Sequence, residues 1–304
     1  MSREDFFRSK GRGHDHAAAV AAHKGMPGFH LLKAKRNFGA AALPLDLTGL
    51  CQYLQTSAGG PGIRDQKEVG ACEGYAHSSG VTLLMASRKT PVKLISAIGW
   101  YQCALLIQRQ PNADGTMPAL IDSGTEPSII QQAAMTYGIA SVEAWGNEPA
   151  TPESVIVQPV LDQLEAAQAY LIVGMYAIQS TGDQYLTDVL TAWANGYPVT
   201  AAIDASSPTF NNYTGGILSA MGNNIDHATL LPGGTWDGKD LESIVGRGVN
   251  SWGDGNEGDP AWGESDAPGI TAGMYRCDAS FLLAYSKVSY VLDVVPIKTG
   301  EVLI

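Results

Sequence analysis

The sequence predicts an α+β fold, because segments with helix-type patterns come first along the chain and strand-type segments follow. Three stretches have the pattern of amphipathic helices: 126–139, 160–173 and 183–196. Short apolar runs between glycines come next: 198–205, 227–233, 242–253 and 274–284. The chain has 35 glycines in 304 residues, which favours turns and strands over a helical bundle. Elements segregated in this way do not predict an alternating parallel sheet.

The expected helices carry start and stop signals. Pro127 fits the first turn of the 126–139 helix, and Gly138 ends that helix. Gly196 closes the 183–196 helix in the same manner. A further helix is expected over 73–88, directly after Cys72, although a Ser-Ser-Gly sequence in its middle lowers the helix propensity.

The composition excludes several classes of function. A net charge of −11 argues against nucleic-acid binding, which needs basic patches. No stretch is long and apolar enough to span a bilayer. The first residues are polar and mixed in charge, unlike a secretory signal. We therefore expect no nucleic-acid partner, no membrane partner and a non-secreted protein.

Four widely spaced cysteines contain no CxxC pair: Cys51, Cys72, Cys103 and Cys277. This spacing suggests neither a zinc site nor a dense disulfide framework, and it is simplest in a reducing compartment. We interpret Cys51, Cys103 and Cys277 as core thiols.

Residues 1–40 are rich in Ala, Gly, Lys and His and lack sustained periodicity, so they are expected to form a flexible or surface-draped arm. The arm contains irregularly spaced histidines, which are expected to be solvated rather than to bind metal: His14, His16, His23 and His30. Residues 41–304 are expected to form the main domain.

The residues of cysteine catalysis are present in a chemically sensible order. A nucleophilic cysteine needs a thiolate, a histidine that shuttles protons, a group that orients the histidine, and donors for an oxyanion. Cys72 precedes the expected helix, whose N-terminus stabilises a thiolate. His227 opens an apolar run, and Asn250 follows downstream in the sequence NSWG. Gln66, six residues before Cys72, has an amide for an oxyanion.

These motifs together resemble the papain family of cysteine peptidases. DQKEVGAC (65–72) is similar to the family's glutamine-to-cysteine segment, IDHA (225–228) to its histidine strand and NSWG (250–253) to its asparagine motif. The resemblance extends over about residues 43–285 and is close to bacterial and viral branches. It implies a two-lobe fold, with a helical lobe at about 60–190 and an antiparallel, barrel-like β lobe at about 195–290 plus 41–58.

The resemblance also implies a role for each residue. Cys72 would attack a peptide carbonyl, His227 would hold the thiolate as an ion pair, Asn250 would orient the histidine, and Gln66 would bind the oxyanion. Trp252 would cover the hydrogen bond between His227 and Asn250. Three further residues, with Trp252, are the expected substrate-binding set: Ser123, Gly124 and Asp226. No metal or organic cofactor is needed.

The main departure from the family is Glu73, which stands where most members carry an aromatic residue. A carboxylate beside a thiolate raises the thiol pKa by like-charge repulsion, but the same carboxylate is favoured in the first turn of a helix. If Glu73 points away from the cleft, the ion pair survives; if it points in, the ion pair weakens. Val69 replaces a disulfide cysteine of secreted relatives.

Three functions are compatible with this pattern, because a fold does not by itself define an activity. The first is a cysteine endopeptidase whose partner is a polypeptide substrate. The second is a weakly active or inactive structural or binding protein, for example in a phage virion, with residues 1–40 as a minimal pro-peptide, an extra strand or an assembly tether. The third is acyl transfer to another acceptor. The expected location is cytoplasmic or virion-associated.

Overall fold

The computed structural model describes residues 16–36, 47–54, 62–89, 93–146, 151–168, 170–220, 222–253, 255, 260–265, 267 and 269–296. The α-helices are α2 (His16–Gly25), α3 (Phe29–Arg36), α4 (Cys72–Ser87), α5 (Ala97–Gln108), α6 (Pro127–Tyr137), α7 (Val142–Trp145), α8 (Pro152–Val155), α9 (Leu161–Ala167), α10 (Gly182–Ala194), α11 (Pro208–Asn211) and α12 (Ala279–Ala284). The 3-10 helices are η1 (Leu47–Tyr53), η2 (Leu241–Ser243) and η3 (Ser286–Val288). The strands are β1 (Tyr170–Ala177), β2 (Val199–Ile203), β3 (Ile217–Leu218), β4 (His227–Thr235), β5 (Val245–Val249), β6 (Met274–Asp278) and β7 (Ser289–Pro296).

The strands form one sheet in the order β1-β7-β2-β4-β5-β6-β3. All neighbouring strands are antiparallel except β3 and β6, which are parallel. His227 begins β4 and lies opposite Ile203, the last residue of β2. Val249 ends β5 opposite Leu230 of β4. This register brings the start of β4 and the end of β5 to the same region of the sheet.

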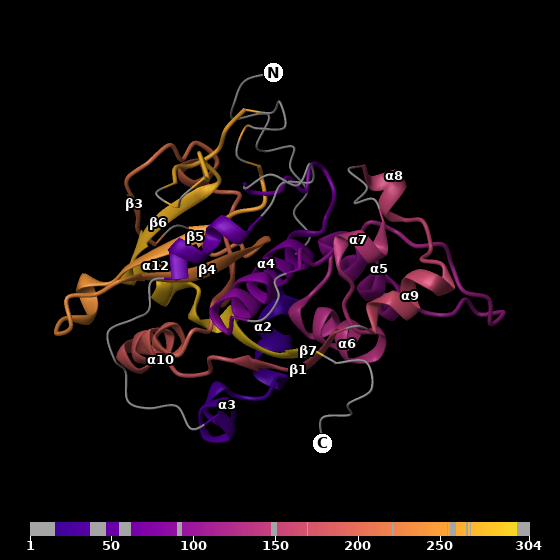
Figure 1. The fold of residues 1–304 in the computed structure, drawn as a ribbon, viewed down its shortest axis with the longest axis horizontal. Coiled ribbons are helices and arrows are strands. Elements are labelled where there is room, and N and C mark those ends of the chain that lie inside the picture. Colours follow the sequence, from indigo (N-terminus) through magenta and orange to yellow (C-terminus); the bar gives the residue numbers. More distant parts are fainter. Residues whose placement is uncertain are drawn as a thin grey trace.

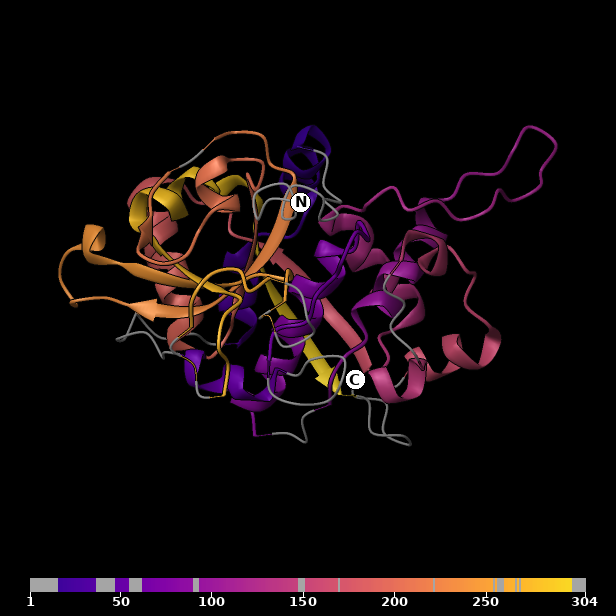
Figure 2. The same cartoon turned by 90° about the horizontal axis from the view of Figure 1, so that it is seen from above.

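The molecule has two halves that meet at α4. Helices α5 to α9 lie on one side of α4, and strands β3 to β6 with α10 and α12 lie on the other, in both views (Figures 1 and 2). Helix α4 contacts α5 in the helical half and β4 in the sheet half. The structure therefore confirms the α+β class and the two-lobe arrangement expected from the sequence.

Helix α4 forms despite its low intrinsic propensity because its glycines permit close packing. A Cβ on Gly74 would lie 2.4 Å from the backbone oxygen of Ala97 in α5. A Cβ on Gly80 would lie 3.2 Å from a methyl carbon of Leu230 in β4. Tertiary packing of this kind routinely outweighs the cost of about 1 kcal/mol for a glycine in a helix.

Several sequence predictions are confirmed at the level of elements. Helix α6 contains Pro127 in its first turn and ends at Gly138, whose φ is 81°. Strands β2, β5 and β6 lie within the predicted segments, while α10 begins one residue before its segment and β4 extends two residues beyond its segment. Helix α5 lies in a segment where no element was expected from the sequence.

Two predicted segments change type midway. The 160–173 segment was expected to be one helix, but α9 ends at Ala167 and β1 begins at Tyr170. The aromatic and β-branched residues of β1 favour a strand, and β7 pairs with it along its length. Part of the predicted helical lobe therefore belongs to the sheet.

The 274–284 segment also changes type. Strand β6 ends at Asp278, and helix α12 follows directly. The Asp278 side chain caps α12 by accepting a hydrogen bond from the Phe281 N–H.

The described part of residues 1–40 is not a surface-draped arm. Three apolar residues of this part, Met26, Phe29 and Leu32, are buried in the main core. The Pro27 carbonyl accepts a hydrogen bond from the Ala177 N–H of β1 at 2.8 Å. Spaced three residues apart, the apolar side chains form one face across α3 and the turn before it. Residues 1–15, including His14, and 37–40 lie outside the described residues.

His23 is also buried, contrary to the expectation of a solvated side chain. It is 5% exposed, and its ring meets the Tyr290 ring edge-on with centroids 5.3 Å apart. His30 is exposed as expected. The buried position of His23 follows from the packing of α2 against α6 and η3.

Leu32→Ala tests whether α3 is part of the core. Leu32 is fully buried, so we expect the free energy of unfolding to fall by about 2–5 kcal/mol. Leu31→Ala is the matched control: Leu31 is 50% exposed, and its loss should change the free energy by less than about 0.5 kcal/mol. Chemical denaturation measures both, and equal effects would contradict the packing.

His23 should make stability depend on pH. Burial lowers the pKa of His23 from 6.5 to about 4, so the unfolded chain binds more protons than the folded chain between these values. Its contribution to stability is fully present above pH 6.5 and is lost as the pH falls towards 4. His23→Leu should remove at most about 3 kcal/mol of this pH dependence, as measured by denaturation at several pH values. Identical profiles for the two proteins would contradict the assignment.

Candidate active site

Cys72 is the first residue of α4, so the helix begins one residue earlier than the expected 73–88 segment. The preceding residue, Ala71, makes no side-chain capping bond, so the backbone N–H groups of the first turn and the positive end of the helix dipole lie at the thiol. Cys72 packs in a small cluster with Ala76 of α4 and Ala228 of β4. Ala228 follows His227, so the crossing of α4 and β4 brings the thiol and the imidazole into one region.

Asn250 orients the His227 ring. The Nε2 atom of His227 lies 2.7 Å from Oδ1 of Asn250, and Oδ1 also accepts a hydrogen bond from the Ser251 N–H at 2.8 Å. Because Oδ1 is an acceptor, Nε2 is the donor in its bond. Any proton exchange with the Cys72 thiol must then use Nδ1.

Trp252 covers this pair. Its ring centroid lies 5.0 Å from that of His227, at an interplanar angle of 36°. Phe210 and Trp262 pack against Trp252 with centroid distances of 5.4 and 5.6 Å. Trp252 is fully buried, so it can shield the hydrogen bond from water but presents no surface to a substrate in this structure.

Gln66 is held beside the asparagine segment by a short antiparallel bridge between Asp65 and Trp252. The Gln66 N–H donates to the Ser251 carbonyl at 2.9 Å, and the Ser251 hydroxyl donates to Oε1 of Gln66. Nε2 of Gln66 donates one hydrogen to the Val69 carbonyl at 2.8 Å. The two sequence motifs are thus physically paired, and the amide of Gln66 is fixed in orientation.

Gly124 lies against the cysteine loop. Its φ is 72°, and a Cβ on Gly70 would approach its Cα to 3.3 Å. The Gly124 N–H donates to the Tyr101 hydroxyl at 2.9 Å, so pairing with a substrate would use its carbonyl. Ser123 is exposed beside it.

Asp226 is half-buried, and its side chain binds the backbone just after the end of β2. Its Oδ1 accepts a hydrogen bond from the Ala205 N–H at 2.8 Å. This contact positions the residue before His227, and a substrate contact by Asp226 stays a prediction.

Tyr101 and Asp122 are site residues that the sequence analysis missed. The Tyr101 hydroxyl donates to Oδ1 of Asp122 at 2.6 Å, and Asp122 accepts from the Gly70 N–H at 3.1 Å. Burial, followed by the charge of Asp122, raises the pKa of Tyr101. The pair ties the cysteine loop to the Gly124 loop. Its residues come from a helix and a loop, and no local motif links them.

Glu73 is buried in the protein, with its carboxylate directed towards His77. It is 1% exposed, and its Oε2 lies 3.0 Å from Nδ1 of His77, one turn along α4. The orientation that the sequence left open is thus one in which the carboxylate lies against His77 in the protein interior.

The candidate site is closed in this structure. Cys72 and His227 are both 0% exposed. A substrate therefore has no open path to either side chain in this structure.

The other three cysteines, Cys51, Cys103 and Cys277, are also buried, as expected of core thiols, and burial raises the pKa of Cys103 to about 12. Within the described ranges, no group of His, Cys, Asp or Glu could hold a metal ion, and no helix is long and apolar enough to cross a membrane.

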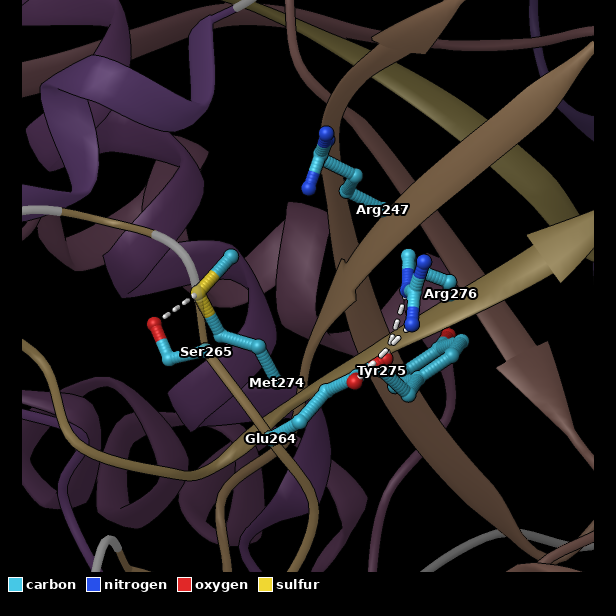
Figure 3. A pocket seen from close by; sticks show the side chains of 6 residues that line it. All are labelled: Arg247, Glu264, Ser265, Met274, Tyr275 and Arg276. Carbon is cyan, nitrogen blue, oxygen red and sulfur yellow. Dashed lines mark hydrogen bonds and ion pairs between the residues drawn. The ribbon is translucent and has the colours of Figure 1, made fainter. Parts of the chain in front are cut away.

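A separate cavity of about 220 Å³ lies along β5, β6 and the 264–265 segment (Figure 3). Arg276 binds Glu264 through two hydrogen bonds of 2.7 and 3.1 Å, and Tyr213 donates to the same carboxylate at 2.5 Å. Burial by itself would raise the pKa of Glu264, but the hydrogen bonds from Arg276 and Tyr213 outweigh burial and lower this pKa. The cavity belongs to the β half and is not lined by the cysteine helix.

Comparison with solved structures identifies the fold. Xylellain, a cysteine protease from Xylella fastidiosa, aligns with a TM-score of 0.58 and 19% identity over 84% of this chain and 88% of its own. Digestive procathepsin L 3 of the Tenebrio molitor larval midgut aligns with a TM-score of 0.51 and 16% identity over 95% of this chain and 90% of its own. Recombinant stem bromelain precursor aligns with a TM-score of 0.54 and 17% identity over 84% of this chain and 70% of its own.

These likenesses show that the chain has the papain-like fold. No protein-family model matches the sequence, and no curated protein matches it significantly.

Tyr101→Phe tests the connection between the two loops. Loss of the hydroxyl leaves Asp122 and the Gly124 N–H without this partner in a buried place, so the free energy of unfolding should fall by about 1–3 kcal/mol. Tyr53→Phe is the control, since Tyr53 is 42% exposed and the change should be nearly neutral. Thermal or chemical unfolding measures both; a neutral Tyr101→Phe would contradict the role.

Proposed function

We propose that the protein is a cysteine peptidase that hydrolyses peptide bonds through Cys72, His227 and Asn250. The observation that carries the proposal is the 2.7 Å contact between His227 and Asn250 beside the N-terminus of the cysteine helix. The papain-like fold and the cysteine proteases among its structural neighbours support the same chemistry.

Each residue has a defined part in this reaction. The Cys72 thiolate attacks the carbonyl carbon, and a C–S bond forms while the carbonyl oxygen becomes an oxyanion. The C–N bond then breaks as Nδ1 of His227 gives its proton to the leaving amine. Water attacks the resulting thioester, His227 takes the proton from water, and Cys72 leaves as the thiolate. Asn250 holds the ring throughout, and Trp252 keeps water from the hydrogen bond.

The oxyanion donors would be the second Nε2 hydrogen of Gln66 and the backbone N–H of Cys72. Preorganised donors of this kind commonly contribute 10²–10³-fold to the rate. The bonds from Gln66 to Val69 and Ser251 support this role because they fix the amide before a substrate arrives. The carbonyl of Gly124, with Ser123 and Asp226, would contact the polypeptide.

A second candidate function is a structural or binding protein with weak or no catalysis. The closed site favours it, since a peptide cannot reach a thiol that is 0% exposed without an opening movement. The buried packing of α2 and α3 argues that residues 16–36 stay with the folded protein rather than serving as a removable pro-peptide. For this candidate we predict assembly contacts through residues 1–40 and a cytoplasmic or virion location.

Iodoacetamide labelling of Cys72, followed by peptide mass spectrometry across pH, separates the two candidates. For a peptidase, labelling should stay fast well below the free-thiol pKa of about 8.5, and His227→Ala should abolish this low-pH reactivity. Cys103 is the internal control, because a buried thiol with a raised pKa should label only after unfolding.

Labelling of Cys72 only near the free-thiol pKa, or none in the folded state, would support the non-catalytic alternative. Hydrolysis of a mixed peptide library by wild type, and not by Cys72→Ser, would then be the remaining test of activity.

A further inference from the structure

A buried pair of ionisable residues lies directly behind the candidate nucleophile. Glu73 and His77 are each 1% exposed and face one another along α4, with 3.0 Å between Oε2 and Nδ1. The Nδ1 atom also lies 2.8 Å from the Glu73 carbonyl oxygen. Nδ1 therefore faces two acceptor oxygens and must carry a hydrogen.

The other ring nitrogen indicates the charge of the pair. Nε2 of His77 lies 3.2 Å from the Thr200 hydroxyl, which donates to the Tyr290 carbonyl at 3.5 Å. In the arrangement that satisfies both the carbonyl and Nε2, the hydroxyl gives its one hydrogen to the carbonyl and accepts from Nε2. His77 then carries hydrogens on both ring nitrogens, and the pair is a carboxylate facing an imidazolium.

Other titratable groups surround this pair. Tyr290 of β7 is close enough that the charges of Glu73 and Glu126, after burial itself, raise its pKa. His23 of α2 lies edge-on to Tyr290. On a different side of α4, the buried Arg64 donates to Ser78 at 2.7 Å. Tyr101 and the catalytic His227 lie on the Cys72 side. Among the contacts described for Glu73, His77 supplies a protonatable nitrogen at hydrogen-bond distance from its carboxylate.

A buried negative charge next in sequence to the thiol would oppose thiolate formation. At an effective dielectric constant of about 20, an uncompensated charge on a neighbouring residue shifts a titration by about one to two pH units. An imidazolium in contact with the carboxylate cancels most of this effect, because the two charges form a dipole whose field falls off faster.

We propose that His77 is a positioning residue for the reaction: it neutralises Glu73 and holds it away from Cys72, which permits a thiolate to form beside a buried carboxylate. This inference rests on the proposed peptidase function and adds a residue to its machinery. It explains how the chain carries a glutamate at this place in the helix.

The test is a pH titration of the Cys72 thiolate by ultraviolet absorbance, taken as the difference between each protein and the same protein carrying Cys72→Ser. The readout needs no reagent to enter the closed site. The proteins are wild type, His77→Gln, Glu73→Gln and the double variant. His77→Gln should raise the midpoint by about one to two pH units. Glu73→Gln should not raise it.

The double variant distinguishes neutralisation from simple structural support. Once Glu73 is uncharged, His77→Gln should leave the midpoint near that of wild type, a rescue that a packing defect would not give. An unchanged midpoint in His77→Gln, or an equal shift in both backgrounds, would overturn the proposal. If His77→Gln does not fold, the double variant decides alone. A folded double variant whose Cys72 titration midpoint lies well above that of wild type would overturn the proposal.

The same titration keeps this proposal separate from the proposed function. A wild-type midpoint near that of a free thiol, unaffected by His227→Ala, would reject the catalytic ion pair. The dependence on His77 and Glu73 is a difference between variants and is measured whatever the wild-type midpoint is.

Discussion

The enclosure of helix α4 is the constraint on which the rest of the structure depends. Nearly every residue from Cys72 to Met85 is buried, so α4 must be packed on several sides at once. Gly74 and Gly80 make this possible by letting α5 and β4 approach the helix closely. Because α4 is fixed between the two halves, its first residue has a fixed position, and the β4 strand that crosses it sets the place of His227.

The candidate site depends on hydrogen bonds that cross between the motifs. Asn250 holds His227, while Ser251 joins the asparagine segment to Gln66 through both backbone and side-chain bonds. Tyr101 and Asp122 connect the cysteine loop to the Gly124 loop on the other side. Buried polar groups that are satisfied in this way rigidify a site, since each is costly to leave without a partner. The consequence is a preorganised but closed arrangement.

The N-terminal helices extend the core beyond the part that resembles papain-like proteins in sequence. Met26, Phe29 and Leu32 join the same cluster as residues of β1 and β7. Lys33 adds an ion pair of 2.6 Å with Asp188 of α10. The pair is partly exposed and contributes little by itself, so the apolar contacts carry the attachment. The segment is therefore better understood as part of the folded body than as an appendage.

Local signals in the sequence determined a large part of this protein. They placed α6 between Pro127 and Gly138, gave the strands around His227 and before Asn250, and ordered Gln66, Cys72, His227 and Asn250 along the chain. Only the tertiary structure decided that residues 170–177 form a strand, that residues 16–36 enter the core, and that Glu73 turns towards His77. The reason is physical: the strand needs β7 as its partner, the apolar face of α3 needs a surface to cover, and the direction of a buried carboxylate is set by the cation and helices around it. Spacing along a chain does not encode partners that arrive from distant segments.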